Sequence, residues 1–351
     1  MNPLCLESIV IAVPRSEKNP LISQLYSAIK AKHENQKVYW GIDFFWDPEF
    51  HSSIYHIHWP EALFDWANPN ENDLDDLERI LKKKKKLSKF VVNVHNYSPH
   101  SDSILNFKRL YQIIYSNADS IIHFGEKSIN HVESTYNLTC NHHIIAHPIY
   151  DSIFKNISIK DARRQLKISE DSFICLTFGA IRSTKELMLV FRGFHKSKTK
   201  NKKLFLVGSK MDFGGLLVNR FRLFCLKHLL APNHILINRF VSEDEISLYV
   251  SAADCLIIPR MNSLNSGNLY LGFTYKKTVI APNNGVIGEI ASKSNNLLFD
   301  PLVPETLGHA IDKAFERKTN PHLAQNNNLE SKTSADVAQL YMNLYKSILT
   351  N

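Results

Sequence analysis

The sequence predicts an α/β protein built from doubly wound parallel sheets, and three observations lead to this expectation. Strand-like apolar runs alternate with helix-like stretches along the chain, the order that successive βαβ units produce. The chain has 351 residues, which is enough for two domains of ordinary size. Between Pro148 and Ile159 the periodicity lapses and polar residues dominate, so we place a domain boundary there.

The first half of the chain alternates between the two kinds of segment. Strands are expected at Ser8–Val13, Lys37–Ile42, Ile54–His58, Phe90–His95, Ser120–Phe124 and His143–His147. Helices are expected at about Leu21–Lys32, Leu74–Lys86, Ile104–Ser116 and Lys127–Tyr136. In open parallel sheets, ligands bind beyond the carboxyl ends of the strands. The residues that follow each strand are therefore the first candidates for a functional site.

The second half resumes the alternation after the break. Helices are expected at Lys160–Leu166, Lys185–Phe194, Leu216–Leu230, Glu243–Ala252 and Glu305–Glu316, and strands at Phe173–Gly179, Leu204–Gly208 and Ile235–Ile237. A last amphipathic helix, about Ser334–Ile348, is expected to cross back and pack on the first half. The expected architecture is two Rossmann-like domains, residues 1–150 and 151–330, that face each other across a cleft, with residues 331–351 forming the crossing helix.

Composition limits the class of partner. The formal charge of +8 and the pI near 9.1 indicate an anionic partner, and no motif points to nucleic acid, which we exclude. Five scattered cysteines without CxxC spacing exclude a disulfide framework and a zinc ribbon, and fit a reducing cytoplasm. No signal-peptide pattern and no apolar run approaching the ~20 residues of a membrane span is found. We expect a cytoplasmic protein, in solution or on the inner face of the membrane.

The segment from Cys255 to Ile290 is the most informative part of the sequence. An apolar strand, Cys255–Pro259, leads into a polar loop, a helix at Asn268–Tyr275 and a second strand at Thr278–Ala281. Such a βαβ unit presents free backbone N–H groups where its helix begins, and these favour an anion such as a phosphate. The Ser266-Gly267 pair would let a ligand approach the backbone closely. The alternative is an ordinary turn between a strand and a helix.

Arg182 and Lys185 occupy a similar strand end. The expected strand Phe173–Gly179 runs into Ala-Ile-Arg182-Ser-Thr-Lys185, at the opening of a helix. Arginine offers a planar fork to phosphate oxygens and lysine adds a compact charge. We favour phosphate binding over the alternative of two solvated cations, because both residues would lie at the same sheet edge as the Asn265-Ser266-Gly267 loop.

Histidines follow two strands of the first half. His95 ends the expected strand Phe90–His95, and a histidine can exchange a proton near neutral pH. His56 and His58 alternate onto one face of the expected strand Ile54–His58. Without a third ligand at a recognisable spacing we favour polar groups and Trp59 lining a sugar-sized cleft, and we expect no metal site.

Further candidates lie near these strand ends. Glu61 could be a general base, and Arg15 follows the first strand in another loop that would face the cleft. The run Lys82–Lys86 closes an expected helix, where cations suit the negative end of the dipole. A solvated helix end is the default for this run, and contact with anionic lipid is the alternative.

These segments together resemble nucleotide-sugar glycosyltransferases of the GT-B fold, in the neighbourhood of retaining family 4. FGAIRSTKE is similar to the family's glycine-arginine-lysine turn, which implies diphosphate contacts for Arg182 and Lys185. NSGNLYLGFTYKKTVIAPNNGVIGE is similar to the donor loop and helix, which implies diphosphate contacts for Ser266, Gly267 and Asn268. The resemblance also places Asn265 and Glu289 on the donor sugar or nucleotide. VVNVHNYSPH and HIHWPE resemble first-domain segments of bacterial polysaccharide enzymes, and IIAHPIY resembles the strand that enters the hinge. His58, Trp59 and Arg15 would lie on the acceptor side.

One departure from the family pattern concerns the donor loop. Family 4 usually has two glutamates where this chain has Ser263 and Leu271, so retaining chemistry does not follow from the resemblance. Asparagine-serine-glycine loops also occur in xanthan-type polysaccharide mannosyltransferases, some of them inverting. If the reaction inverts, His95 is the first candidate for the base and Glu61 the second.

The resemblance therefore implies transfer of a hexose from a UDP- or GDP-linked sugar to a glycan acceptor, expected to be lipid-linked, in bacterial surface polysaccharide synthesis. The acceptor-binding domain would be residues 1–150 and the nucleotide-sugar-binding domain residues 151–330. Cations and helix amides would stabilise the leaving diphosphate, so no metal or other cofactor is expected. The alternatives are a non-catalytic nucleotide-sugar-binding protein and a nucleotide-sugar epimerase on the same fold.

Overall fold

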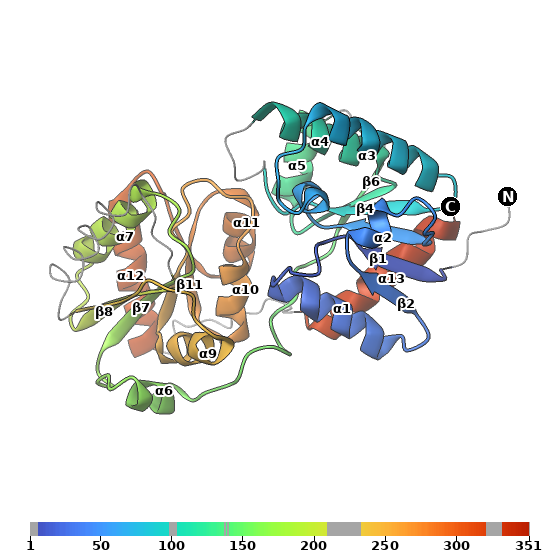
Figure 1. Ribbon diagram of the computed structural model, residues 1–351. Coiled ribbons are helices and arrows are strands. Elements are labelled where there is room, and N and C mark those ends of the chain that lie inside the picture. The colour runs from blue at the N-terminus through green and yellow to red at the C-terminus, as the bar shows by residue number, and fades with distance from the viewer. Residues whose placement is uncertain are drawn as a thin grey trace. The chain divides into compact units, whose positions relative to one another are not determined.

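The computed structural model describes residues 6–97, 104–136, 138, 140–208, 233–320 and 332–350. The chain divides into two compact units, which are described separately (Figure 1). The first unit contains residues 1–148 together with residues 332–351, and the second contains residues 149–331.

The first unit alternates strands and helices. Its strands are β1 (Ser8–Ile11), β2 (Lys37–Trp40), β3 (Ile54–Ile57), β4 (Lys89–Asn93), β5 (Ser120–His123) and β6 (Asn141–Ile144). Its helices are α1 (Pro20–Lys32), α2 (Asp43–Trp46), the 3-10 helix η1 (Pro60–Phe64), α3 (Glu71–Lys84), α4 (Ile104–Asn117), α5 (Glu126–Thr135) and, from the end of the chain, α13 (Ser334–Thr350).

The second unit has the same organisation. Its strands are β7 (Phe173–Phe178), β8 (Lys202–Val207), β9 (His234–Ile237), β10 (Cys255–Ile257), β11 (Thr278–Pro282) and β12 (Leu297–Phe299). Its helices are α6 (Ile159–Gln165), α7 (Thr184–Lys196), α9 (Glu243–Ala252), α10 (Gly267–Thr274), α11 (Gly285–Lys293) and α12 (Pro304–Thr319). The predicted helix at Leu216–Leu230 lies outside the described residues.

The first sheet has the order β2-β1-β3-β4-β5-β6, and all its strands are parallel. One face packs against α1 and α13, where Ile9 and Ile11 share a buried cluster with Ile22 and Tyr341. The other face is covered by α3, α4 and α5 (Figure 1). The last helix of the chain therefore completes the core of the unit that contains the first strand.

The second sheet has the order β12-β11-β10-β7-β8-β9 and is also parallel throughout. Alternate residues of each strand face opposite sides. Cys175 and Cys255 pack with α7 and α12, whereas Ile174 and Leu256 pack with α9, α10 and α11. Two parallel sheets, each with helices on both faces, confirm the predicted α/β class with two Rossmann-like domains.

Side-chain caps explain where several helices begin. Asn19 accepts a hydrogen bond from the Leu21 N–H before α1, with Pro20 at the first helical position. Asn70 and Asp73 form a reciprocal capping box at the start of α3. Ser183 accepts from the Glu186 N–H before α7, which fixes the point where the loop after β7 becomes helical.

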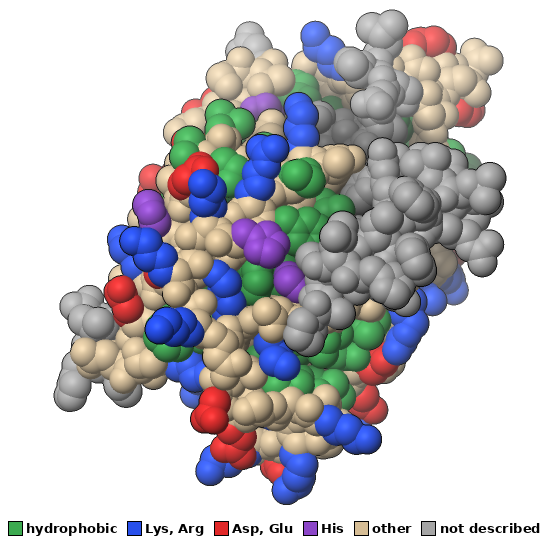
Figure 2. Space-filling model, turned by 90° about the vertical axis from the view of Figure 1, so that its left-hand side faces the viewer, with side chains coloured by type: hydrophobic (Ala, Val, Ile, Leu, Met, Phe, Trp, Pro, Cys, Tyr) green, Lys and Arg blue, Asp and Glu red, His purple; other side chains and the backbone are tan. Residues whose placement is uncertain are grey.

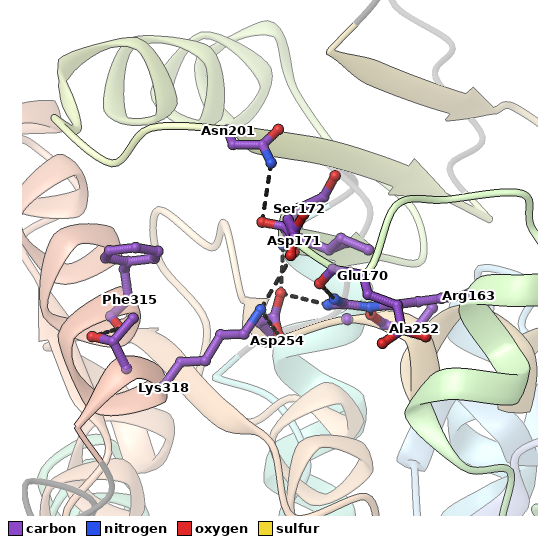
Figure 3. A network of polar contacts seen from close by, with 12 residues as sticks. Arg163, Glu170, Asp171, Ser172, Asn201, Ala252, Asp254, Phe315 and Lys318 are labelled. Carbon is purple, nitrogen blue, oxygen red and sulfur yellow. Dashed lines mark hydrogen bonds and ion pairs between the residues drawn. The ribbon is translucent and has the colours of Figure 1, made fainter.

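A buried ion-pair network lies at the amino end of the second sheet (Figure 3). Asp254 directly precedes β10, and its carboxylate accepts from Arg163 of α6 at 2.7 Å and from the Ile174 N–H at 2.7 Å. Lys318 of α12 lies 3.0 Å from the same carboxylate. The Arg163 and Asp254 side chains are each 4% exposed. The network joins α6 and α12 to the end of the sheet opposite the strand-end loops.

The lysine run at the end of α3 differs from the expected solvated helix end. Lys84 is fully buried, and its ammonium group donates to the carbonyls of Asp47 and Phe50 and to the Tyr55 hydroxyl at 2.7–2.9 Å. Burial lowers the pKa of Lys84 to about 8. Position 84 follows Leu77 and Leu81 on the apolar face of the helix, which is why this one lysine points inward.

The remaining surface features are simpler. On the face shown in Figure 2, Lys and Arg side chains are dispersed and Asp and Glu lie among them. No helix in the described ranges is both long enough and apolar enough to cross a membrane.

Candidate functional site

The candidate residues collect at the carboxyl edges of the two sheets. In the second sheet the strand order reverses between the neighbouring strands β7 and β10, and in the first sheet between β1 and β3. Such a reversal leaves a crevice at the carboxyl ends of the two strands, which is where open α/β sheets bind ligands. Each unit therefore has one candidate site, built from the loops that leave these strands.

In the second unit, Asn268 links the start of α10 to the end of β7. Its side-chain amide donates to the Phe178 carbonyl at 2.6 Å. Directly after Phe178, Gly179 has a φ of +85°, a left-handed conformation that side chains rarely adopt. The structure thus brings together the two loops that the sequence predicted to hold a phosphate, because both leave adjacent central strands.

Arg182 and Lys185 lie on the loop and first helical turn after β7. Both residues are exposed, and within the described residues neither side chain donates a hydrogen bond or forms an ion pair. Desolvation and then the neighbouring Arg260 cation lower the pKa of Arg182 from its usual value. Since no described residue pairs with either side chain, both cations are available to an anionic ligand at this edge.

Arg260 was not among the predicted site residues. It follows Pro259 after β10, and its guanidinium donates to the Glu186 carboxylate at 2.8 Å and to the Ala180 carbonyl at 3.0 Å. Glu186 also accepts from the Arg182 N–H at 2.8 Å. The strand-end rule that selected Arg182 applies equally to Arg260, so the signal was present in the sequence. Its carboxylate partner could not be deduced, because Glu186 is distant in sequence.

Hydrogen bonds from the start of α11 hold the polar loop after β10 in place. The Asn284 amide donates to the Met261 carbonyl at 2.9 Å, and the N–H groups of Val286 and Ile287 donate to the Leu264 carbonyl. Gly285 has a φ of +61°, and a Cβ there would lie 2.2 Å from the Ser263 carbonyl oxygen. Only glycine allows this approach, which fixes the shape of the loop.

The helix that follows this loop begins without a side-chain cap. Ser266 is the N-cap of α10 but makes no capping hydrogen bond. Neither the Gly267 nor the Asn268 N–H has an acceptor in the part of the chain that the structure describes. A Cβ on Gly267 would lie 2.7 Å from the Tyr150 hydroxyl oxygen, so the backbone here is closely packed on one side. These amides and the positive end of the helix dipole suit a phosphate.

The two other predicted donor contacts have protein partners. Glu289 on α11 pairs with Lys293 at 2.8 Å, and its side chain is 8% exposed. The Asn265 carbonyl accepts from the Ser263 hydroxyl at 2.9 Å. At the two positions where family 4 usually has glutamates, Ser263 is thus engaged inside the loop, and Leu271 points from α10 into the buried core.

In the first unit, His95 lies within a cluster of rings. Its Nε2 is 3.1 Å from Nδ1 of His58, and its ring stacks on Trp59 with centroids 4.2 Å apart. These residues leave the carboxyl ends of the neighbouring strands β3 and β4, as predicted from the alternation. Desolvation first, and then the nearby histidines, hold the pKa of His95 and of His58 well below the usual value. Both rings are therefore neutral at pH 7.

His56 is a structural member of this cluster. Its ring centroid lies 4.1 Å from that of His58, which confirms that the two alternate onto one face. Its Nε2 donates to Asn93 Oδ1 at 2.7 Å, and its Nδ1 accepts from the Tyr345 hydroxyl of α13 at 2.7 Å. Burial lowers the pKa of His56 to about 4. The last helix thereby fixes one end of the histidine cluster, a contact that sequence reasoning missed.

Glu61 is buried on η1 and points toward α4. Its carboxylate accepts from the Tyr111 hydroxyl at 2.9 Å. Desolvation raises the pKa of Glu61, which favours its protonated form. The hydrogen bonds of Glu61 and of His95 lead to different partners, so the structure does not join the two predicted base candidates in one network.

Arg15 lies after β1 on the surface. Its guanidinium donates to the Asp43 carboxylate at 2.6 and 3.2 Å and lies 5.2 Å from the centre of the Phe44 ring. Unlike Arg182, it already has a carboxylate partner among the described residues. A substrate that bound Arg15 would have to share its guanidinium with Asp43.

The described residues offer little for a metal ion. They contain no group of three or more His, Cys, Asp or Glu side chains arranged to hold one. The single Asp-x-Asp sequence, Asp73-Leu74-Asp75, lies in the first five residues of α3, where Asp73 caps the helix and Asp75 pairs with Arg109. These aspartates therefore have a structural role at the helix start.

Comparison with known proteins now bears on both units. Residues 158–331 match the family model described as glycosyl transferases group 1. Solved structures match nearly the whole chain: a glycosyltransferase from Rickettsia africae has a TM-score of 0.75 at 14% identity, with 98% of this chain and 99% of that one covered. The resemblance to GT-B glycosyltransferases is confirmed.

Other GT-B structures agree. The sucrose-phosphate synthase of Thermosynechococcus elongatus has a TM-score of 0.73 at 14% identity, covering 97% of this chain and 99% of that chain. Anabaena HepE, solved in complex with UDP-glucose, has a TM-score of 0.73 at 12% identity, covering 98% and 100%. No curated protein sequence matches the chain. At these identities the structures show the GT-B fold, and placement in family 4 or among xanthan-type enzymes stays a prediction.

Proposed function

We propose that this protein is a glycosyltransferase that moves a hexose from a nucleoside diphosphate sugar to a hydroxyl group of a glycan acceptor. The observation that carries the proposal is the bond from Asn268 to the Phe178 carbonyl. It sets the uncapped start of α10 beside the loop that bears Arg182, whose guanidinium has no partner in the described residues. The group 1 family match over residues 158–331 supports the same reading.

Each group of this site has a role in stabilising the leaving diphosphate. The diphosphate gains negative charge as the glycosidic bond breaks, and donors already in place stabilise that charge without rearrangement. Arg182 and Lys185 supply cations, and the amides of Gly267 and Asn268 supply hydrogen bonds, with Ser266 at the loop end. Because these groups can neutralise the charge, the proposed reaction needs no metal ion.

The proton of the acceptor hydroxyl requires a separate group if the reaction inverts the sugar. His95 is the first candidate, because it is neutral at pH 7 and follows the carboxyl end of β4, although its lowered pKa makes it a weak proton acceptor. Glu61 is the second: its raised pKa strengthens the ionised carboxylate as a base but lowers the ionised fraction, and the carboxylate already accepts from Tyr111. His58, Trp59 and Arg15 would lie on the acceptor side.

The finer identity of the substrates is also proposed. HepE was solved with UDP-glucose, which supports a UDP-linked donor, with GDP-linked sugars as the alternative. Asn265 and Glu289 would contact the sugar or nucleotide. The acceptor would be a lipid-linked glycan of a bacterial surface polysaccharide, reached from the cytoplasmic side of the membrane. The exposed Lys82, Lys85 and Lys86 at the end of α3 would suit anionic lipid there.

The donor site is tested by binding before activity. A nucleotide that binds only the folded protein raises its melting temperature. We expect UDP or GDP to do so, and Arg182→Ala to lower the affinity about 10- to 100-fold, the loss of one or two charge-assisted hydrogen bonds. Arg164→Ala is the matched control, since Arg164 is an exposed arginine of the same unit on α6, paired with Asp161. Unchanged affinity in Arg182→Ala would refute the diphosphate assignment.

A non-catalytic nucleotide-sugar-binding protein is the second candidate. Ser263 and Leu271 stand where family 4 has its glutamates, and Leu271 is a core residue that cannot contact a sugar. This reading predicts nucleotide binding without release of UDP or GDP when donor and glycan acceptors are mixed. An epimerase would instead convert the donor sugar with no acceptor present, so product analysis separates the three.

A further inference from the structure

Trp66 is an exposed aromatic residue at the carboxyl edge of the first sheet. It follows β3 and η1, and 44% of its surface is exposed. A large indole left in contact with water is unusual, because burying it is strongly favourable. Trp66 is not among the predicted site residues. It lies beyond the end of a central strand, where this fold binds ligands.

The backbone of Trp66 is held in a strained conformation. Asp65 ends η1 in the left-handed region with a φ of 52°, and Trp66 follows with a φ of 66°. The Asp65 N–H donates to the Ala62 carbonyl and the Trp66 N–H to the Glu61 carbonyl, each at 3.1 Å. One left-handed residue suffices to end a helix in this way, and glycine is preferred there. A second left-handed residue that carries a bulky side chain is strained, and strain of this kind is common at functional sites.

The indole is also the outer member of an aromatic series that leads to His95. The Trp66 and Trp59 rings are 5.7 Å apart at 53°, and Trp59 stacks on His95 at 4.2 Å and 25°. Trp59 and His95 are buried or nearly so, at 7% and 9% exposure. The exposed ring is thus packed against a buried partner, and a continuous series of ring contacts joins it to the proposed base.

We infer that Trp66 is a stacking platform for a pyranose ring of the acceptor glycan. The face of a pyranose presents C–H groups, which pack on the electron-rich face of an indole, while its hydroxyl groups need polar partners at the rim. Asp65 and Asn68, which are next to Trp66 and two residues after it in the sequence, are both exposed and could supply them. This inference rests on the proposed function, since it names how the acceptor of that reaction is held.

The test uses glycine to separate the ring from the backbone. Trp66→Gly removes the indole yet suits the left-handed conformation, and this relief of strain offsets part of the lost ring packing, so the variant should still fold. Trp66→Phe keeps an aromatic face. Phe240→Gly, which removes an aromatic residue of the second unit that is 85% exposed, is the matched control. Saturation-transfer NMR measures binding of methyl glycosides of glucose, mannose, galactose and N-acetylglucosamine to each variant.

We expect the wild type and Phe240→Gly to transfer saturation to the ring C–H protons of at least one glycoside. Trp66→Phe should bind it more weakly, and Trp66→Gly with about tenfold lower affinity or not at all. No transfer with any glycoside in the wild type, or equal transfer in Trp66→Gly, overturns the inference. The thermal response to UDP and GDP reports separately on the donor site, so failure of the proposed function is distinguished from failure of this platform.

Discussion

The Arg260 guanidinium lies 2.8 Å from the Glu186 carboxylate, and both side chains are less than a tenth exposed. The pair joins the loop after β10 to the first turn of α7, and Glu186 also accepts from the Arg182 N–H. A single carboxylate therefore positions both loops of the proposed donor site. It also offsets part of the positive charge that an anionic ligand would meet.

Removal of this carboxylate should destabilise the protein strongly. Glu186→Ala leaves the buried Arg260 without its counter-charge, and we expect the free energy of unfolding to fall by about 3–5 kcal/mol. Chemical denaturation measures it. Glu49→Ala, which removes the exposed partner of Lys83, should leave it nearly unchanged. If Glu186→Ala were no worse than this control, the ion pair would not support the loops.

Lys84 should resist acetylation in the folded protein. Its ammonium group is enclosed by three oxygen acceptors, whereas Lys82, Lys85 and Lys86 are exposed. Acetylation with limiting reagent, read by mass spectrometry, should label the three neighbours and leave Lys84 unmodified. The same digest after denaturation is the control, because Lys84 should then react as they do. Early labelling of Lys84 would contradict its burial.

Glu61 should make stability depend on pH. Its raised pKa means that the folded protein favours the protonated acid, so its contribution is present below the ordinary carboxyl pKa and is lost as pH rises through the raised value. Glu61→Gln should therefore unfold at a higher denaturant concentration than the wild type at pH 8, and show no such gain at pH 4. Equal differences at both pH values would show that the carboxyl group is not desolvated.

His95 can act as the proposed base only if its ring is in one particular tautomer. Its Nε2 faces His58 Nδ1 at 3.1 Å, so a lone pair for the acceptor must be on Nδ1, with the proton on Nε2 donated to His58. His58 then carries its own proton on Nε2, which is buried with no acceptor in the described chain, at a cost of about 1–3 kcal/mol. Nitrogen-15 NMR of labelled histidines identifies the tautomer. A proton on Nδ1 of His95 would exclude the base and leave a hydrogen-bond donor.

The buried His56 should contribute to acid unfolding. Its pKa of about 4 lies below the ordinary histidine value, so the stability it provides is lost as pH falls from about 6.5 toward 4. His56→Gln should weaken the dependence of unfolding free energy on pH over this window. His51→Gln, at an exposed position, is the control and should leave the slope unchanged.

Much of the fold follows from local pattern. Alternating apolar runs predicted the parallel sheets, and the strand-end rule placed Arg182 and the Asn268 loop at one edge, as the structure has them. Contacts between distant segments have no such local signal. Nothing in the sequence near His56 indicates that Tyr345 hydrogen-bonds it, and Lys84 sits in a run that looks uniformly solvated.

The short elements were missed for a related reason. η1 spans Pro60–Phe64 and α2 spans Asp43–Trp46, too short for a helical period to show in the sequence. Trp66 was missed with η1, because its exposure depends on how that turn ends.

The position of α13 also sets an order of events during synthesis. The buried residues Val337, Tyr341 and Tyr345 complete the core over β1 and β3, yet they are synthesised after the whole of residues 149–331. Residues 149–331 form a continuous stretch that has already emerged by then. The half of the protein that is translated first is therefore the half that finishes folding last, and until then it holds an uncovered apolar sheet face.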